Sequence, residues 1–195
     1  AAGSGGAGRA PGAPGGYLFP DTYRVPVDER GRVADPDQVV RMMLDRFQEV
    51  FGPEEQAEAR RQGLTVHQVV TLASIVEREA RVAEERPLIA AVYRNRLERG
   101  MSLDADPTVL YALGRTSGPL TARDLQVASP YNTYRHPGLP PGPIVPGPGV
   151  PGGRPAPRGR RLPVLRAQPG RIGPSPLRAH PGGARAQRPG LSPVP

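Results

Sequence analysis

One carboxylate of the sequence stands where a surface charge is not expected, on the apolar side of a predicted helix. Apolar residues recur at helical spacing over residues 66–80, and they are Val66, Val69, Val70, Ala73, Val76 and Ala80. At about 100° per residue, Glu77 falls inside that apolar arc and Arg78 falls on the polar side. A lone carboxyl group in apolar surroundings has a raised pKa, which suits a general acid at neutral pH. The pattern therefore makes Glu77 a candidate catalytic acid.

Two alternatives remain open for the glutamates of this helix. Glu77 could form a structural ion pair instead, with Arg81 four residues later or with an arginine of the next helix. Glu79 is a second candidate acid, but its place close to the helix end predicts a solvated side chain.

The other residues that could do chemistry give weaker signals. His67 lies in the first turn of its helix and is predicted to be exposed. His136 has no cysteine, histidine or acidic residue at ligand spacing, so no metal site is predicted. Asp104 and Asp106 could bind a cation, although a helix cap explains Asp106 better. There is no phosphate-binding glycine loop and no nucleophile motif, and we expect no cofactor.

The loop Tyr131-Asn132-Thr133-Tyr134 combines aromatic and amide side chains. Such groups bind sugars by stacking and hydrogen bonding, and they equally serve to pin a loop to a core. Both interpretations remain open at this point.

The segments that position these residues are mostly helical. Apolar spacing and end signals predict helices at about 36–51, 53–62, 66–80, 83–99 and 106–113, with another cap signature at 121–124. The aromatic and β-branched residues 17–25 predict a strand, in which Pro20 forces an edge or a bulge. These elements predict the α+β class.

Composition divides the 195 residues into three regions. Residues 1–16 are nearly all Ala, Gly and Pro, residues 17–143 contain every aromatic and acidic residue, and residues 144–195 contain nine Arg and no acid. We therefore expect one globular domain between disordered Gly/Pro-rich ends. Only the basic tail could attract nucleic acid, and we expect no nucleic-acid partner. Without cysteine there is no disulfide framework, and no apolar run is long enough to span a membrane.

Several segments together resemble one known family. They are Gly16-Tyr-Leu-Phe-Pro-Asp-Thr-Tyr23, Leu72-Ala-Ser-Ile-Val-Glu-Arg-Glu-Ala80, Val92-Tyr-Arg-Asn-Arg-Leu97, Asp106-Pro-Thr-Val109, and Ser129-Pro-Tyr-Asn-Thr-Tyr134 followed by Gly138-Leu-Pro-Pro-Gly142. In this order they resemble the MltG/YceG family of endolytic murein transglycosylases, over about residues 16–144.

The resemblance implies a helix-rich catalytic domain with a small sheet. Members are bacterial inner-membrane proteins with one N-terminal anchor and a catalytic domain on the periplasmic or extracellular side, where cell-wall synthases are the expected partners. They are lyases that cut the β-1,4 bond between N-acetylmuramic acid and N-acetylglucosamine in nascent peptidoglycan strands, leaving 1,6-anhydromuramyl ends. The resemblance assigns catalysis to Glu77. It implies that the glycan cleft is lined by Asn95, Asp106, Thr108, Tyr131, Asn132 and Tyr134, each of which also has a structural alternative.

The end of the chain departs from the family pattern. Members continue past Gly-Leu-Pro-Pro-Gly-Pro-Ile with an Asn-Pro-Gly turn, a helix and an aromatic strand, whereas Ile144 leads here into a Pro/Arg/Gly tail. We interpret residues 145–195 as a frameshift product, with a genuine divergent tail as the alternative, and residues 1–16 as a disordered or non-native leader. A missing strand would leave a sheet edge unpaired, so a catalytically inactive peptidoglycan-binding fragment is the alternative function.

Overall fold

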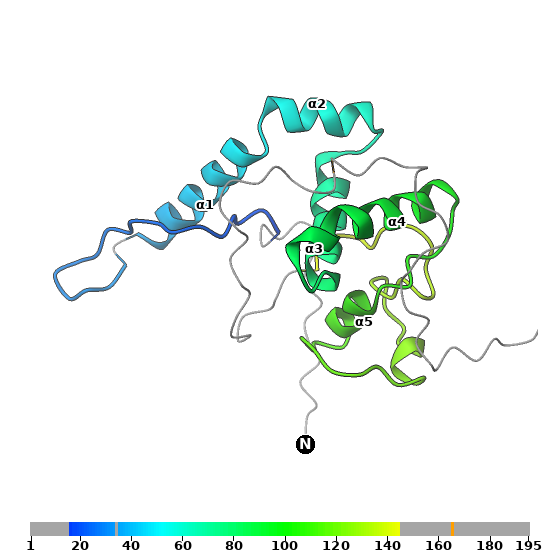
Figure 1. Cartoon of the computed structure of the whole chain (residues 1–195). Helices are drawn as coiled ribbons and strands as arrows, with labels where there is room; N and C mark the ends of the chain where they lie inside the picture. Colours follow the sequence, from blue (N-terminus) through cyan, green and yellow to red (C-terminus); the bar gives the residue numbers. More distant parts are fainter. Residues whose placement is uncertain (1–15, 34, 145–164, 166–195) are drawn as a thin grey trace, which may run out of the picture.

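The part of the chain that the structure describes is built from helices. A computed structural model describes residues 16–33, 35–144 and 165. The elements follow in the order α1 (Pro36–Val50), α2 (Pro53–Arg61), α3 (Val66–Glu79), η2 (Ala83–Glu85), α4 (Arg86–Glu98), α5 (Asp106–Ala112) and η3 (Asp124–Gln126), where η denotes a 3₁₀ helix (Figure 1).

Capping residues set where α1 and α3 begin. The Asp35 carboxylate accepts a hydrogen bond from the Asp37 amide at 2.9 Å, directly before the proline that opens α1. Thr65 and Gln68 form the predicted reciprocal cap of α3, because each side chain accepts from the other residue's amide, at 3.2 and 2.9 Å. Each cap satisfies backbone donors that a helix start otherwise leaves unpaired. The sequence therefore located both starts correctly.

The predicted helix at 83–99 forms in two parts. Residues 83–85 are the 3₁₀ turn η2, and α4 follows from Arg86 with Pro87 in its first turn. Gly100 and Gly114 adopt φ values of +64° and +68° just after α4 and α5. That conformation is costly for other residues, so these glycines end the two helices where the sequence predicts.

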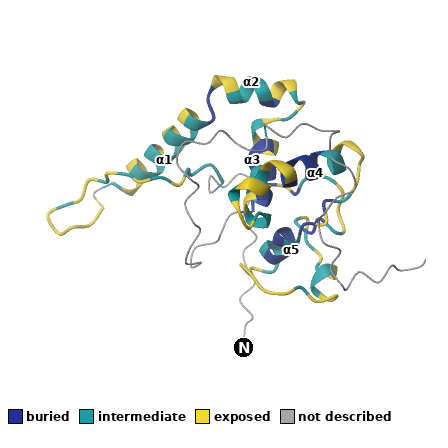
Figure 2. Cartoon of the chain, viewed as in Figure 1, coloured by how far each residue is buried: buried dark blue, intermediate teal, exposed yellow. Residues whose placement is uncertain are grey.

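Helix α3 is the centre of the core. Its buried residues are Val69, Val70, Thr71, Leu72, Ile75 and Val76. It packs against α2, α4 and α5, and Tyr93 of α4 fills the space beside it. Figure 2 shows buried residues concentrated in α3, α4 and α5. The segment that ends at the buried Ile144 completes this core.

Helix α1 lies outside this body and contains no fully buried residue. It is flanked instead by the extended segment that precedes it. The Phe19 amide donates to the Met43 carbonyl at 3.3 Å, and the Tyr17 ring meets the Phe47 ring edge-on at 5.3 Å. In Figure 1, α1 and this segment reach away from the other helices.

The predicted strand at residues 17–25 does not form. In the described ranges the only β pairing is an isolated antiparallel bridge between Val27 and Val33. A strand needs a partner, and prolines at 20 and 26 each remove a donor that a ladder would use. The α+β prediction is therefore right about the helices and wrong about the sheet for the part of the chain described.

Both predicted disordered ends lie almost entirely outside the described residues, as does the proposed frameshift. Leu165 alone is described in the tail; it packs against the core, and its carbonyl accepts a hydrogen bond from the Gln62 side chain at 2.8 Å.

Candidate active site

Glu77 is exposed, which corrects the burial expected from the helical pattern. The buried side of α3 is centred on Leu72 and Val76, and Glu77 lies at its flank because Val66 and Ala73 are themselves only half-buried. Within the described ranges no hydrogen bond or ion pair holds the Glu77 carboxylate, so the alternative of an ion pair with Arg81 is not observed there. The carboxylate is thus available to a molecule that reaches this face of α3.

Glu79 occupies the opposite face of the same helix. Two residues along an α-helix turn the side chain by about 200°. Glu79 is half-buried, which corrects the prediction that the helix end would solvate it. It lies close enough to Tyr93 and Tyr134 for its charge to act on both. Burial chiefly raises the pKa of Tyr93, and the charge of Glu79 raises it further.

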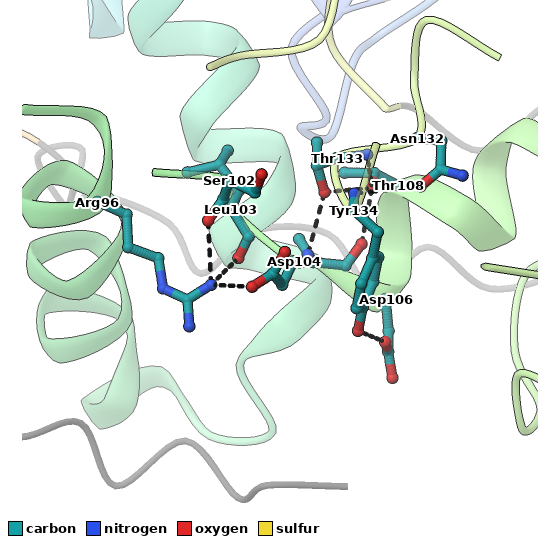
Figure 3. Close-up of polar contacts among 10 residues, drawn as sticks. Arg96, Ser102, Leu103, Asp104, Asp106, Thr108, Asn132, Thr133 and Tyr134 are labelled. Atoms are coloured by element: carbon teal, nitrogen blue, oxygen red, sulfur yellow. Dashed lines mark hydrogen bonds and ion pairs between the residues drawn. The ribbon is translucent and has the colours of Figure 1, made fainter. Parts of the chain in front are cut away.

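Tyr134 and Asp106 form a tight pair across two elements (Figure 3). The Tyr134 hydroxyl donates to Oδ1 of Asp106 at 2.5 Å. Burial chiefly raises the pKa of Tyr134, and the hydrogen bond to the Asp106 carboxylate adds to the rise. The tyrosine therefore keeps its proton as a donor at neutral pH. Asp106 is the first residue of α5 and does not cap it, because Ala105 occupies the cap position.

Asn132 organises the loop that carries these aromatic residues. Its side-chain amide donates to the carbonyls of Leu125 and Val127, both at 2.9 Å, and its oxygen accepts from the Tyr134 amide at 3.1 Å. The residue is 0% exposed, so these bonds satisfy it inside the protein. In the described conformation it holds Tyr134 in place and presents no surface of its own.

Thr108 and Thr133 fasten this loop to α5. Their hydroxyl oxygens lie 2.8 Å apart, the Thr108 hydroxyl donates to the Ala105 carbonyl at 2.7 Å, and Thr133 Oγ1 accepts from the Ala105 amide at 3.0 Å. Both threonines are buried. Thr108, predicted as a glycan contact, thus has the surroundings of a positioning residue.

Arg96 holds the turn that leads into α5. Its Nη1 donates to the carbonyls of Ser102 and Leu103 and to Oδ2 of Asp104, at 3.1, 2.7 and 2.9 Å (Figure 3). Asp104 has a φ of +51°, a left-handed conformation that non-glycine residues rarely adopt. Arg96 therefore pairs with the Asp104 carboxylate, which the sequence offered as a cation ligand, and fixes the backbone just before Asp106.

The two remaining predicted site residues are half-buried. Tyr131 lies against Tyr111 of α5, with ring centroids 4.8 Å apart and a tilt of 54°. Asn95 is on α4, two residues after Tyr93. The structure thus joins Asp106, Thr108, Asn132 and Tyr134 in one bonded network, with Glu79 near it and Glu77 on the other face of α3.

Sequence reasoning missed Thr133 and Arg96, whose hydrogen bonds hold the loop and the turn around Asp106. Thr133 stood inside the quoted loop motif, and Arg96 within the α4 motif, but their partners lie in other segments. Within the described ranges, no cluster of three His, Cys, Asp or Glu side chains could hold a metal ion. None of the helices described there has the length and apolarity to cross a membrane.

Comparison with known proteins identifies the family. The model of the YceG-like family matches residues 9–149, well over half of the chain. The endolytic murein transglycosylase of Bacillus subtilis (strain 168) is 39% identical over 134 residues, covering 67% of this chain and 35% of that protein. The protein of the same name from Streptococcus pneumoniae serotype 2 (strain D39) is 36% identical, covering 66% of this chain and 23% of that protein.

A solved structure is similar as well. The crystal structure of a yceG-like protein from Listeria monocytogenes is 42% identical with a TM-score of 0.59, covering 66% of this chain and 41% of that one. The chain belongs to the YceG-like family. It spans about a third or less of the length of the two named transglycosylases.

Proposed function

We propose that residues 16–144 carry the catalytic site of an endolytic murein transglycosylase, with Glu77 as its acid and base. The observation that carries this proposal is the accessible carboxylate of Glu77 at the family motif, in a chain whose relatives are named for that activity. An exposed carboxylate without an internal partner can approach a glycosidic oxygen, which a structural ion pair would prevent.

The proposed reaction needs one carboxyl group in two successive roles. The protonated Glu77 donates its proton to the glycosidic oxygen as the bond to C1 of N-acetylmuramic acid breaks, and N-acetylglucosamine leaves as an alcohol. The resulting carboxylate accepts the proton of the muramyl 6-hydroxyl while that oxygen bonds to C1. The product is a 1,6-anhydro sugar, and Glu77 ends protonated again. Since the nucleophile belongs to the substrate, no second carboxylate is required to activate water.

The other residues that the family resemblance places at the glycan divide into two groups in this proposal. Asp106, Tyr134, Asn95 and Tyr131 are only half-buried, so a glycan can reach them and we assign them to glycan contacts. Thr108 and Asn132 act through them, because both are 0% exposed and are bonded within the protein.

The setting of this activity is part of the same proposal. The family resemblance supports a longer protein anchored in the bacterial inner membrane, with this region on the periplasmic or extracellular side beside cell-wall synthases. Peptidoglycan glycan strands are the proposed substrate.

A matched pair of variants tests the assignment. Glu77→Gln and Glu79→Gln remove one carboxylate each, two residues apart on opposite faces of α3. Release of anhydromuramyl ends from purified uncrosslinked glycan strands should fall about 10²–10⁴-fold in Glu77→Gln, the usual cost of losing general acid–base catalysis. Glu79→Gln should retain turnover, and both variants should unfold at the wild-type temperature.

Two results would overturn the proposal in different ways. If Glu79→Gln is the inactivating change, the acid has been assigned to the wrong face of α3. If the unaltered chain binds glycan strands but releases no anhydromuramyl ends, residues 16–144 form a binding fragment and not an enzyme.

A further inference from the structure

The first and last described segments of the domain meet on one face of α3. His67 and Ser74 lie on that face, two helical turns apart. We call "the clasp" the side chains of Tyr17, His67 and Ser74 together with the backbone of residues 141–144. His67 and Ser74 bond to that backbone, and Tyr17 bonds to His67.

His67 bonds to both segments at once. Its Nε2 lies 2.8 Å from the Pro141 carbonyl oxygen, and its Nδ1 lies 2.9 Å from the Tyr17 hydroxyl. A carbonyl only accepts, so Nε2 donates to Pro141, and Nδ1 is the partner of the Tyr17 hydroxyl. Burial raises the pKa of Tyr17, which keeps that hydroxyl a donor. One imidazole thus links the start of the domain to its end.

Ser74 makes the second attachment, in register with the first. Its Oγ accepts from the Ile144 amide at 3.0 Å. Seven helical residues rise about 10.5 Å, and three residues of extended chain span about 10 Å. Residues 141–144 can therefore run nearly extended along α3 from His67 to Ser74. Glu77 is three residues beyond Ser74, a neighbour on the same face of the helix.

The same segment passes close to Tyr131. A Cβ built on the buried Gly142 would lie 3.4 Å from the Tyr131 hydroxyl oxygen and 3.6 Å from Cε1 of His67. The next residue of the segment, Pro143, lies against Gly16. A Cβ built on Gly16 would lie 2.5 Å from Cγ of Pro143, closer than any real contact. Gly16 is therefore needed for the two segments to meet.

We propose that His67 is a positioning residue, which holds residues 141–144 on the Glu77 face of α3 and thereby sets Tyr131 for glycan binding. This inference rests on the proposed function, since it assigns Tyr131 and the Glu77 face to the substrate. The clasp contributes to binding through geometry alone, because His67 itself is bonded to protein on both ring nitrogens.

Three variants of the full chain test the clasp at different points. His67→Ala removes both ring bonds, and His67→Gln keeps an amide donor for Pro141 and an oxygen for Tyr17. Gly16→Ala leaves His67 intact and forces Pro143 away. His136→Gln is the matched control, because His136 is an exposed histidine in the loop that follows Tyr134.

The readouts are KM and kcat for glycan strands, the dissociation constant for glycan in a Glu77→Gln background, and hydrogen exchange of the Ile144 amide. His67→Ala and Gly16→Ala should raise KM and the dissociation constant about 10-fold, with kcat nearly unchanged. That factor corresponds to the loss of one well-placed hydrogen bond, here between Tyr131 and the glycan. Ile144 should exchange faster in both. His67→Gln should recover part of the affinity, and His136→Gln should match the wild type.

Each contrary result has a distinct meaning. Unchanged Ile144 exchange in His67→Ala would show that the clasp does not hold the segment, and the inference would fail while the proposed function stands. Faster exchange with unchanged glycan affinity would show that the clasp is merely structural. Absence of glycan binding by the unaltered chain would overturn the proposed function, and the exchange data would still report whether the clasp forms.

Discussion

Helices α1 and α3 carry the same local signals and end in different surroundings. Both have an aspartate or threonine cap, a predicted start and an apolar stripe, yet α3 has six buried residues and α1 has none. The difference lies in their neighbours, since α3 packs between α2, α4 and α5, whereas α1 meets mainly the segment around Phe19. Periodicity therefore predicts that a helix forms and which side is apolar, but depth of burial depends on what covers that side.

The position of the buried face on α3 explains why the helical pattern predicted the exposure of Glu77 and Glu79 wrongly. The predicted apolar arc gave equal weight to Val66 and Ala73, which are only half-buried, and omitted Leu72, which is 0% exposed. The true buried face is therefore rotated toward Glu79 and away from Glu77. An exposed Glu77 remains suited to the role that the family resemblance gives it, but for the reason of access and not of burial.

A matched pair of core truncations should give the largest contrast between the two helices. Leu72→Ala in α3 should lower the free energy of unfolding by about 2–5 kcal/mol, because it leaves a cavity in a close-packed core. Leu44→Ala in α1 should cost much less, because Leu44 is already half-buried. Urea unfolding of the two variants measures both values. Equal losses would mean that α1 is covered in solution as fully as α3.

Most helix positions of this fold were predictable, because the signals that place them are local. Thr65 with Gln68, and Asp35 with Pro36, needed only their own neighbours in sequence to start α3 and α1. The strand at residues 17–25 was not predictable in the same way, because pairing depends on a partner that no described residue supplies. Side-chain type suggested a strand, and tertiary context decided otherwise.

The candidate site was predictable residue by residue but not as a network. The motifs named Asp106 and Tyr134, and only the fold shows that one donates to the other. His67 was set aside as an exposed side chain, and it is exposed, but both its ring nitrogens are bonded to distant segments. Contacts between residues 50 or more apart in sequence cannot be predicted from the spacing of neighbouring residues.

A tyrosine in each region provides the second contrast, at alkaline pH. Burial raises the pKa of Tyr93 in the body, which is 1% exposed. Folding favours the neutral form of Tyr93. Its contribution to the free energy of unfolding is therefore complete below pH 10 and is lost as pH rises toward the folded pKa. Stability should fall by up to about 1.4 kcal/mol per pH unit above pH 10.

The control for this slope is Tyr23, a half-buried tyrosine beside α1 whose hydroxyl donates to the Phe19 carbonyl at 2.6 Å. Burial raises the pKa of Tyr23 as well, but Tyr23 is only half-buried whereas Tyr93 is 1% exposed. Denaturant midpoints measured from pH 9 to 12 should therefore lose more of their slope in Tyr93→Phe than in Tyr23→Phe. A slope that is the same in both variants would show that Tyr93 does not control the alkaline transition.

Loss of the helix caps should give a smaller difference. Thr65→Ala removes the cap of a helix that belongs to the core, so it should lower global stability by about 1 kcal/mol. Asp35→Ala should loosen mainly the first turn of α1, because that helix can fray without opening the core. Hydrogen exchange at Asp37 and Gln68 distinguishes local from global opening. A shift of the unfolding midpoint by Asp35→Ala as large as that by Thr65→Ala would contradict this division.

The smallest effect concerns the turn that joins Val27 to Val33. Asp28 accepts hydrogen bonds from the Arg30 and Arg32 amides, both at 2.9 Å, and the Arg32 side chain adds an ion pair. The Arg32 amide bond is the main cause that lowers the pKa of Asp28 from its ordinary 3.8. A carboxylate with a lowered folded pKa stabilises its turn at any pH above its ordinary pKa, and this stabilisation is lost as pH falls through the folded pKa.

Because the turn is exposed and separate from the core, acidification should abolish the Val27–Val33 contact in NMR spectra without changing the packing of α3. Asp28→Asn should show the weakened contact already at neutral pH. If the contact persists at pH 2 in the unaltered chain, other forces hold the turn; if α3 loosens together with it, the two regions are coupled and the contrast between them is smaller than their burial indicates.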